Sequence, residues 1–158
     1  MFEDRKDAGE KLARALDKYK DKGAIILAIP RGGVEVGYQV AKHLNAEFSI
    51  IIARKLQFPD NPEAGFGAIA EDGSAFIFEF AKDLFSKEMI GKIAEGEQRE
   101  IKRRVEILRG GEPLPDIKGK VVIIVDDGIA MGSTMRTAIM LCKNKKAAKI
   151  VVGSPVAG

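Results

Sequence analysis

The chain has 158 residues, of which 46% are hydrophobic and 31% are charged, and its formal net charge is +3. This length and composition predict one globular domain, residues 1–158, with a buried core. The mild charge excludes an electrostatic case for nucleic acid as a main partner, and no apolar run is long enough to predict a membrane partner. A charged amino-terminus and a single cysteine, Cys142, lead us to expect a cytoplasmic protein in which Cys142 is a small buried apolar residue.

The first third of the chain predicts a β-α-β unit. Apolar residues at helical spacing predict a helix over about Lys6–Lys20, and Gly23 after it prevents the helix from continuing. Two apolar runs, Ala24–Ile29 and Glu47–Ala53, are predicted strands on either side of a helix over Gly33–Leu44. The handedness of crossover connections makes these strands parallel neighbours in one sheet.

The middle of the chain is predicted to hold a lid and a hairpin. Leu56–Gly67 contains prolines and glycines, so we expect a loop that is long enough to act as a functional lid. Asp72-Gly73 separates two apolar stretches, residues 67–71 and 74–78, which is a strong signal for a β-hairpin. Glu71 is expected to be solvated, and the alternatives are that it orders the lid or holds Mg²⁺ through water.

The second half predicts two helices and two further strands. Ser86–Arg109 is a long charged helix that ends at a glycine pair, and its charges are expected to form a solvated face with local ion pairs. Val121 opens a strand, Ser133 to about Lys146 forms a helix, and Lys149–Gly153 is the last strand. The order of elements predicts an α/β fold, with a mostly parallel sheet, helices on both faces and a small β-hairpin or lid region.

The stretch Val121–Thr134 carries the most chemical information. Its apolar run lacks polar alternation, which is typical of a strand buried on both faces. Asp126 and Asp127 follow at the carboxyl end, where open α/β sheets bind their ligands. The helix N-terminus that follows favours binding of a phosphate. Between the strand and the helix, small residues let the backbone approach a ligand closely: Gly128, Ala130, Gly132 and Ser133. Carboxylates that accept from sugar hydroxyls beside a phosphate cradle predict a ribose 5-phosphate site.

Three other interpretations of this stretch are weaker. A magnesium-binding strand of a P-loop NTPase would require the G-x-x-x-x-G-K-[ST] loop, which the chain lacks. A calcium loop needs alternating acidic residues, and Gly128–Met131 supplies none. The remaining alternative is a buried strand that ends in two solvated acids.

Two further segments place positive charge after predicted strands. Arg31, Gly32 and Gly33 follow the first strand, and the glycines allow a tight turn whose amides point into a cleft. Arg54 and Lys55 follow the second strand, directly before the predicted lid, and suit a pyrophosphate. An ordinary turn and an ordinary basic loop are the alternatives.

Val121–Thr134 resembles the phosphoribosyl-pyrophosphate (PRPP) motif of the type I phosphoribosyltransferases. The resemblance extends from the opening stretch Asp4–Gly9 to Ser154–Val156. Within it, residues 62–73 are similar to one little-characterised branch of that family. Met131 stands where the family usually has a threonine, whose hydroxyl would contact the 5-phosphate. We therefore expect weaker binding of the 5-phosphate.

The resemblance implies a Mg²⁺-dependent transfer of ribose 5-phosphate from PRPP to a nitrogenous base, with release of pyrophosphate. Asp126 and Asp127 would hold the ribose hydroxyls, and Asp127 would also accept the proton of the incoming base. Mg²⁺ would be held mainly by PRPP itself. The resemblance also implies a non-proline cis peptide bond entering Arg31. The 5-phosphate would be anchored by Gly128, Ile129, Ala130, Met131, Gly132, Ser133 and Thr134, and the pyrophosphate by Arg31, Gly32, Gly33, Arg54 and Lys55.

The resemblance leaves the acceptor open. Family members normally continue past the last predicted strand with elements of a hood over the base, and we expect residues 1–158 to lack them. A nucleobase-like acceptor would then be held by the lid and the N-terminal region, or by a partner or neighbouring subunit, and we expect a homodimer. A truncated chain is equally open. Phe58 and Phe66 are candidates for stacking on the base, whereas core packing is expected for Phe76, Phe78 and Phe80.

Two functions of another class stay open beside the transferase. The first is a non-catalytic PRPP or nucleotide-binding regulator on the same fold, which Met131 and the missing hood favour. The second is an assembly module whose Ser86–Arg109 helix docks a partner.

Overall fold

The computed structural model describes residues 5–128 and 132–155, and for residues 62–64 it describes the backbone alone. The chain divides into two compact units. Unit 1 comprises Met1–Ile51, Leu114–Met131 and Cys142–Gly158, and unit 2 comprises Ile52–Pro113 and Gly132–Leu141. The single domain over residues 1–158 stays a prediction.

Unit 1 is built on a parallel sheet with the strand order β2-β1-β6-β7. The strands are β1 (Ile25–Ala28), β2 (Glu47–Ile50), β6 (Val121–Val125) and β7 (Lys149–Gly153). Every neighbouring pair is parallel, which confirms the predicted sheet and its crossover connections.

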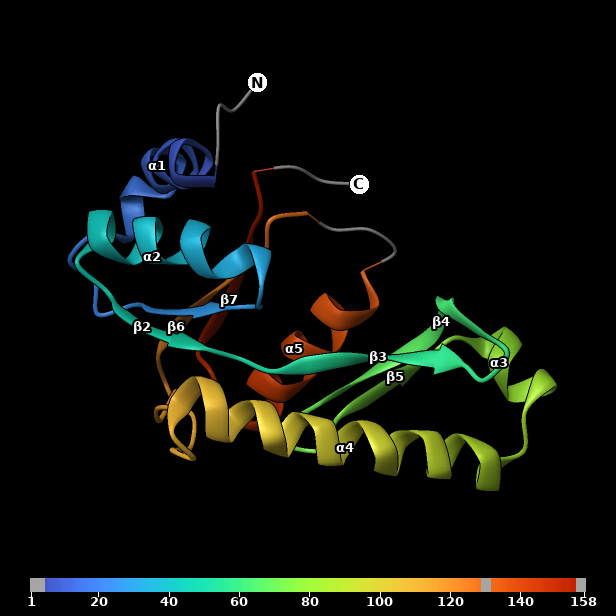
Figure 1. Ribbon diagram of the computed structural model, residues 1–158. Coiled ribbons are helices and arrows are strands. Elements are labelled where there is room, and N and C mark those ends of the chain that lie inside the picture. The colour runs from blue at the N-terminus through green and yellow to red at the C-terminus, as the bar shows by residue number, and fades with distance from the viewer. Residues whose placement is uncertain (1–4, 129–131, 156–158) are drawn as a thin grey trace. The chain divides into compact units, whose positions relative to one another are not determined.

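Helices α1 (Arg5–Ala15) and α2 (Gly32–Leu44) pack against each other and lie on the same side of this sheet (Figure 1). The short 3₁₀ helix η1 (Asp17–Tyr19) follows α1. Gly9 makes the close packing of α1 on α2 possible, because a Cβ there would lie 2.9 Å from the Val36 carbonyl oxygen.

The core of unit 1 lies between these helices and the sheet. Ile26, Ile123 and Val125 point from the strands toward the apolar face of α2, and Ile25, Leu27 and Ile124 are buried as well. Strands β1 and β6 are therefore buried on both faces, as their uninterrupted apolar sequences predict. The core also contains residues of α1, η1 and α2: Ala13, Leu16, Tyr19, Val36, Val40, Ala41 and Leu44.

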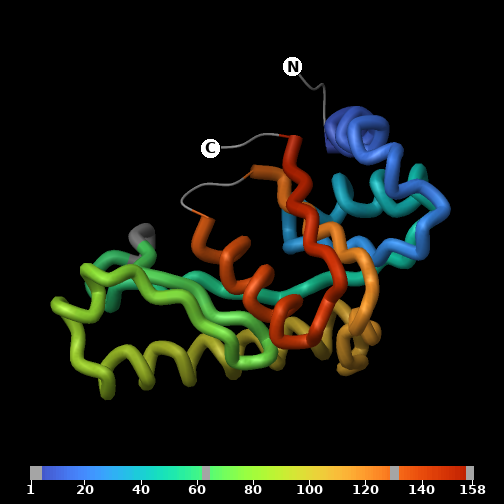
Figure 2. The backbone as a smooth tube through the Cα atoms, turned by 180° about the vertical axis from the view of Figure 1, so that it is seen from behind, coloured from blue at the N-terminus to red at the C-terminus, as the bar shows by residue number. Residues whose placement is uncertain are grey.

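Unit 2 is built on an antiparallel sheet with the strand order β3-β4-β5. Its strands are β3 (Ala53–Phe58), β4 (Asn61–Ala70) and β5 (Ala75–Ile77). A short helix, α3 (Glu79–Leu84), leads to the long helix α4 (Lys87–Arg109), which runs alongside the sheet in both views (Figures 1 and 2). Helix α5 (Ser133–Asn144) begins in unit 2 and ends in unit 1.

The predicted loop over Leu56–Gly67 is wrong, because most of this segment forms the hairpin of β3 and β4. Leu56 is buried and Gln57 exposed, so one face of the hairpin is apolar. The prolines are tolerated because Pro59 lies in the turn and Pro62 lies where the pairing of the two strands is irregular. The second predicted hairpin, at Asp72-Gly73, is confirmed, and Gly73 adopts a left-handed φ of 91°.

The predicted strand over Glu47–Ala53 is too long. β2 ends at Ile50, and β3 begins at Ala53 and pairs with a different sheet. The apolar sequence runs through Ile50, Ile51 and Ile52 without interruption, so it gives no signal for the change of sheet.

Glu71 is not solvated, contrary to the prediction, but holds a buried ion pair. Its Oε1 lies 2.7 Å from Nη2 of Arg109 at the end of α4, and the two side chains are 11% and 8% exposed. Its Oε2 accepts from Nη1 of Arg109 and from the backbone N–H of Ile52, each at 2.8 Å. One carboxylate thus joins the start of unit 2, the end of β4 and the end of α4.

Among the described residues, no helix combines the length and the apolar composition needed to cross a membrane.

We predict that Arg109→Ala lowers the free energy of unfolding by about 3 kcal/mol, because it leaves the buried Glu71 carboxylate without its cation. Urea denaturation measures the change. Arg103→Ala is the matched control on the same helix, since its partner Glu100 is in an exposed pair, and such pairs contribute little to stability. Equal losses in the two variants would contradict the prediction.

Candidate functional site

The two predicted site carboxylates directly follow β6. Residue Val125 of β6 pairs with Ala28 of β1, so the turns after both strands lie at the same edge of the sheet. The backbone N–H of Asp126 donates to the Gly153 carbonyl at 3.2 Å, and Asp126 Oδ1 accepts from the backbone N–H of Asp127 at 2.8 Å. These bonds fix the turn, and both carboxylates stay partly exposed.

Gly32 and Gly33 lie directly against this turn. A Cβ at Gly33 would stand 2.6 Å from the Val125 carbonyl oxygen, and a Cβ at Gly32 would overlap the Asp127 carboxylate. Glycine is needed at both positions because the acidic turn packs on their backbone. The structure therefore brings together two of the predicted segments, which are far apart in the sequence.

Arg31 is exposed at the same turn, directly before α2. The peptide bond between Pro30 and Arg31 is cis, as the resemblance implies.

Asp127 also receives a contact that the sequence did not predict. Nη2 of Arg5, the first residue of α1, donates to Asp127 Oδ2 at 3.1 Å. The side chains are 56% and 41% exposed, so solvent still reaches the carboxylate.

The predicted phosphate loop is described in part. Ile129, Ala130 and Met131 lie outside the described residues. Gly132 has a φ of 78°, and its carbonyl oxygen accepts from the N–H of Arg136 in the first turn of α5 at 2.8 Å. Ser133 is buried and Thr134 partly buried, as parts of the same turn.

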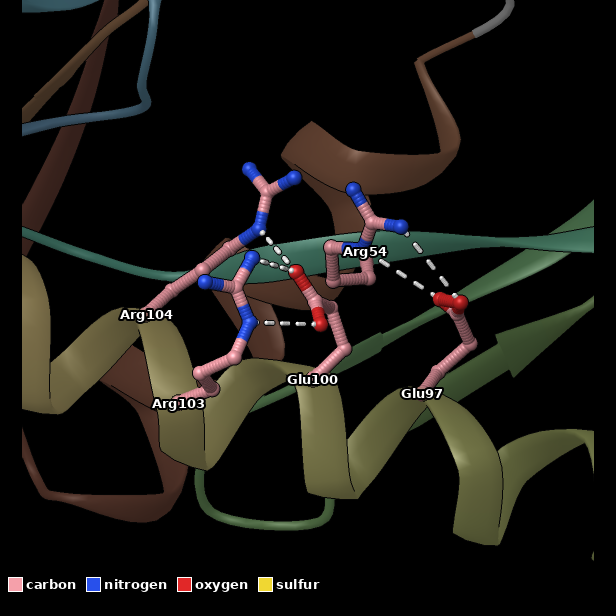
Figure 3. A network of polar contacts seen from close by, with 5 residues as sticks. All are labelled: Arg54, Glu97, Glu100, Arg103 and Arg104. Carbon is pink, nitrogen blue, oxygen red and sulfur yellow. Dashed lines mark hydrogen bonds and ion pairs between the residues drawn. The ribbon is translucent and has the colours of Figure 1, made fainter.

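Arg54 and Lys55 do not end a strand, as predicted, but lie inside β3. Arg54 Nε donates to Glu97 Oε2 of α4 at 3.2 Å, and its Nη2 lies 3.5 Å from Glu97 Oε1 (Figure 3). Lys55 is exposed on the same strand. Of the two predicted cations, Lys55 is therefore the more accessible.

A turn further along α4, Glu100 accepts from Arg103 and Arg104 (Figure 3). The hydrogen bond from Arg103, followed by that from Arg104, lowers the pKa of the Glu100 carboxyl to about 2. These contacts confirm the predicted face of local ion pairs on this helix.

The phenylalanines of unit 2 form a packed cluster. Phe66 is fully buried, which excludes it as a stacking surface in this conformation. Phe58 contacts Phe66, Phe80 and Phe85, with ring centroids 5.5 to 6.2 Å apart. Phe80 is 45% exposed, so it is less buried than the predicted core packing implies.

A pocket of about 440 Å³ lies elsewhere in unit 1. Its lining includes Gln39, Lys42 and His43, from the C-terminal half of α2, whereas Gly32 begins that helix. Its cations, Arg14, Lys20 and Lys42, are exposed side chains of a solvated surface. The lining of this pocket therefore does not include Asp126 or Asp127.

Asp126 and Asp127 could bind a metal ion together with oxygen atoms of a substrate, but they do not form a metal site made of protein ligands alone. In the part of the chain that the structure describes, no three His, Cys, Asp or Glu side chains gather as a metal site. Partly exposed neighbouring carboxylates suit Mg²⁺, which is commonly bound through one or two carboxylates and substrate phosphates.

Comparison with known proteins decides the family. Residues 2–157 match the model of the phosphoribosyl transferase domain. The chain belongs to this family. The strand, acidic turn and glycine turn described above are thus parts of a phosphoribosyl transferase domain.

Two curated proteins of Mycobacterium tuberculosis, from strains CDC 1551 / Oshkosh and H37Rv, are 35% identical to this chain over 158 residues. Each carries a provisional name as a phosphoribosyl transferase. The match covers 99% of this chain but only 36% of each relative, so this phosphoribosyl transferase domain spans about a third of their length.

Solved structures agree on the fold. The protein TT1426 from Thermus thermophilus is 33% identical, with a TM-score of 0.81 over 99% of this chain and 75% of its own. A hypoxanthine phosphoribosyltransferase from Staphylococcus aureus has a TM-score of 0.58 at 14% identity, over 96% of this chain and 62% of its own. A purine phosphoribosyltransferase from Pyrococcus horikoshii has a TM-score of 0.54 at 20% identity, over 92% and 68%. The last two show the fold alone.

Sequence reasoning missed the partners of two predicted site residues, Asp127 and Arg54. Arg5 lies in the opening stretch that carries the resemblance, 122 positions from Asp127, and no local pattern indicates the contact. Glu97 sits on a helix rich in charged residues, and nothing in the spacing selects it as the partner of Arg54.

We predict that Gly32→Ala weakens PRPP binding by roughly 10-fold or more, because the added Cβ displaces the Asp127 carboxylate and one charge-assisted hydrogen bond is lost. Calorimetric titration measures the affinity. Gly91→Ala is the control, because a Cβ there meets no described atom within 4 Å. Wild-type affinity in a folded Gly32→Ala protein would contradict the prediction.

Proposed function

We propose that this protein transfers ribose 5-phosphate from PRPP to a nitrogenous base and releases pyrophosphate. The observation that carries the proposal is the carboxylate of Asp127, next to Asp126, resting on the Gly32 backbone at the carboxyl edge of a parallel sheet. Ligands of open α/β folds bind at such an edge. Membership in the family supports a transferase, while the base and the reaction itself belong to the proposal.

In the proposed reaction, a ring nitrogen of the base forms a bond to C1 of the ribose as the bond from C1 to the pyrophosphate oxygen breaks. The electron pair of that bond leaves with pyrophosphate, and the proton of the base nitrogen passes to the Asp127 carboxylate. Positive charge develops on the sugar ring, so fixed negative charge beside it lowers the barrier. Asp126 and Asp127 would supply that charge while accepting hydrogen bonds from the 2- and 3-hydroxyls.

The remaining contacts of the proposal follow the family resemblance. Residues 128–134 would hold the 5-phosphate. Arg31 with the amides of Gly32 and Gly33, together with Arg54 and Lys55, would hold the pyrophosphate. Asp126 and Asp127 would also hold Mg²⁺ jointly with substrate oxygens, and the ion would supply positive charge for the leaving pyrophosphate.

We predict micromolar binding of PRPP in the presence of Mg²⁺, measured by calorimetric titration. The Asp126→Asn/Asp127→Asn variant should lose roughly 100-fold or more in affinity, because it removes the charged acceptors of both ribose hydroxyls. Glu47→Gln/Asp116→Asn is the matched control. It removes the same charge from exposed residues at or before the amino ends of β2 and β6, away from the acidic turn.

The two outcomes separate the hypotheses. Binding that only the Asp126→Asn/Asp127→Asn variant loses establishes the ribose-phosphate site and justifies a screen of bases for pyrophosphate release. Absence of binding by the folded wild type would contradict the proposed function.

A non-catalytic regulator that binds PRPP is the second candidate, and the methionine at position 131 favours it. Such a protein would bind PRPP with the same dependence on Asp126 and Asp127 but release no pyrophosphate with any base. A homodimer forms part of the proposal through the family resemblance, and size-exclusion chromatography tests it.

A further inference from the structure

The contact between Arg5 and Asp127 has no role in the proposed reaction. Arg5 begins α1, and its Nη2 donates to Asp127 Oδ2 at 3.1 Å. The carboxylate is thereby held between a guanidinium and the backbone of Gly32, against which it packs. The contact stays accessible, because the Asp127 side chain is 41% exposed.

The contact leaves room for substrate on the same carboxylate. A carboxylate offers about four acceptor positions on its two oxygens, and the single N–H of Arg5 takes one of them. Ribose hydroxyls can therefore bind Asp127 without breaking the ion pair.

The charges at this turn need a cation. Asp126 and Asp127 are adjacent carboxylates, and PRPP carries several negative charges of its own. Mg²⁺ supplies part of the positive charge in the proposed function, and a cation in direct contact with a carboxylate reduces the repulsion that remains. Arg5 is the cation in direct contact with Asp127 among the described residues.

We propose that Arg5 is a positioning residue of the PRPP site. Its guanidinium holds the Asp127 carboxylate over Gly32 and offsets its charge, so that the free acceptor positions face the ribose hydroxyls. This inference rests on the proposed function and extends it, because it assigns the first turn of α1 to the substrate site.

The opposite possibility is that the ion pair of Arg5 and Asp127 acts as a lock, that is, it must break before PRPP can bind. Exposed ion pairs of this kind change an equilibrium by no more than about fivefold. Removal of such a lock would raise the affinity for PRPP, whereas removal of a positioning residue lowers it. The sign of the change distinguishes the two.

The first experiment titrates PRPP with Mg²⁺ into the wild type, Arg5→Gln and Arg5→Lys. Arg5→Gln should bind about 3- to 5-fold more weakly. Arg5→Lys should bind within about 3-fold of the wild type, because the contact uses one N–H and an ammonium can replace it. Lys11→Gln is the matched control: it removes one charge and one ion pair of 3.1 Å, with Asp7, from the same helix, and should leave the affinity unchanged.

The second experiment is a double-mutant cycle. If Arg5 acts through Asp127, Arg5→Gln should change the affinity of the Asp127→Asn variant by less than about twofold. A loss that persists undiminished in that background would overturn the proposal, because Arg5 would then contact PRPP itself or act through the stability of α1. Circular dichroism melting of each variant identifies an effect on stability.

The remaining outcomes are also decisive. Equal or tighter binding by Arg5→Gln, with normal binding by the wild type, overturns the positioning role and leaves the proposed function standing. Failure of the folded wild type to bind PRPP overturns the proposed function, and the positioning role fails with it.

Discussion

The packing of the Asp127 carboxylate on the Gly32 backbone is the constraint on which the candidate site depends. It exists because β1 and β6 are parallel neighbours whose register pairs Ala28 with Val125. The chain must turn at the same edge after both strands, and any Cβ at Gly32 would overlap the carboxylate. The site is therefore a consequence of strand order combined with one missing side chain, and its two halves come from distant parts of the sequence.

Unit 2 combines an apolar cluster, which includes the buried Phe66, with two ion pairs that join its elements. The buried pair of Glu71 and Arg109 joins the sheet to the end of α4, and Arg54 and Glu97 join β3 to the same helix. Buried pairs of this kind are sensitive to the loss of one partner. The contact with Glu97 engages a cation that the family resemblance assigns to pyrophosphate, so Arg54 has a structural partner before any substrate arrives.

The parallel sheet, the hairpin at Asp72-Gly73 and the acidic turn could be predicted because each has a local signal. Buried parallel strands appear as apolar runs, and Asp72-Gly73 has the turn chemistry of a hairpin. The β3–β4 hairpin could not be predicted, because the prolines and glycines of residues 56–67 are typical of a loop. The bulged pairing that tolerates Pro62 has no local signal in the sequence. Partners such as Glu71 and Arg109, 38 positions apart, depend on tertiary packing that no local pattern contains. Arg5 was missed for the same reason.

The central claim is that PRPP binds with its ribose at the Asp126–Asp127 turn. A crystal structure of the protein with PRPP and Mg²⁺ tests it most directly. The account predicts the 2- and 3-hydroxyls of the ribose within about 3.2 Å of carboxylate oxygens of Asp126 and Asp127. PRPP bound away from both carboxylates, for example in the pocket beside Lys42 and His43, would contradict it.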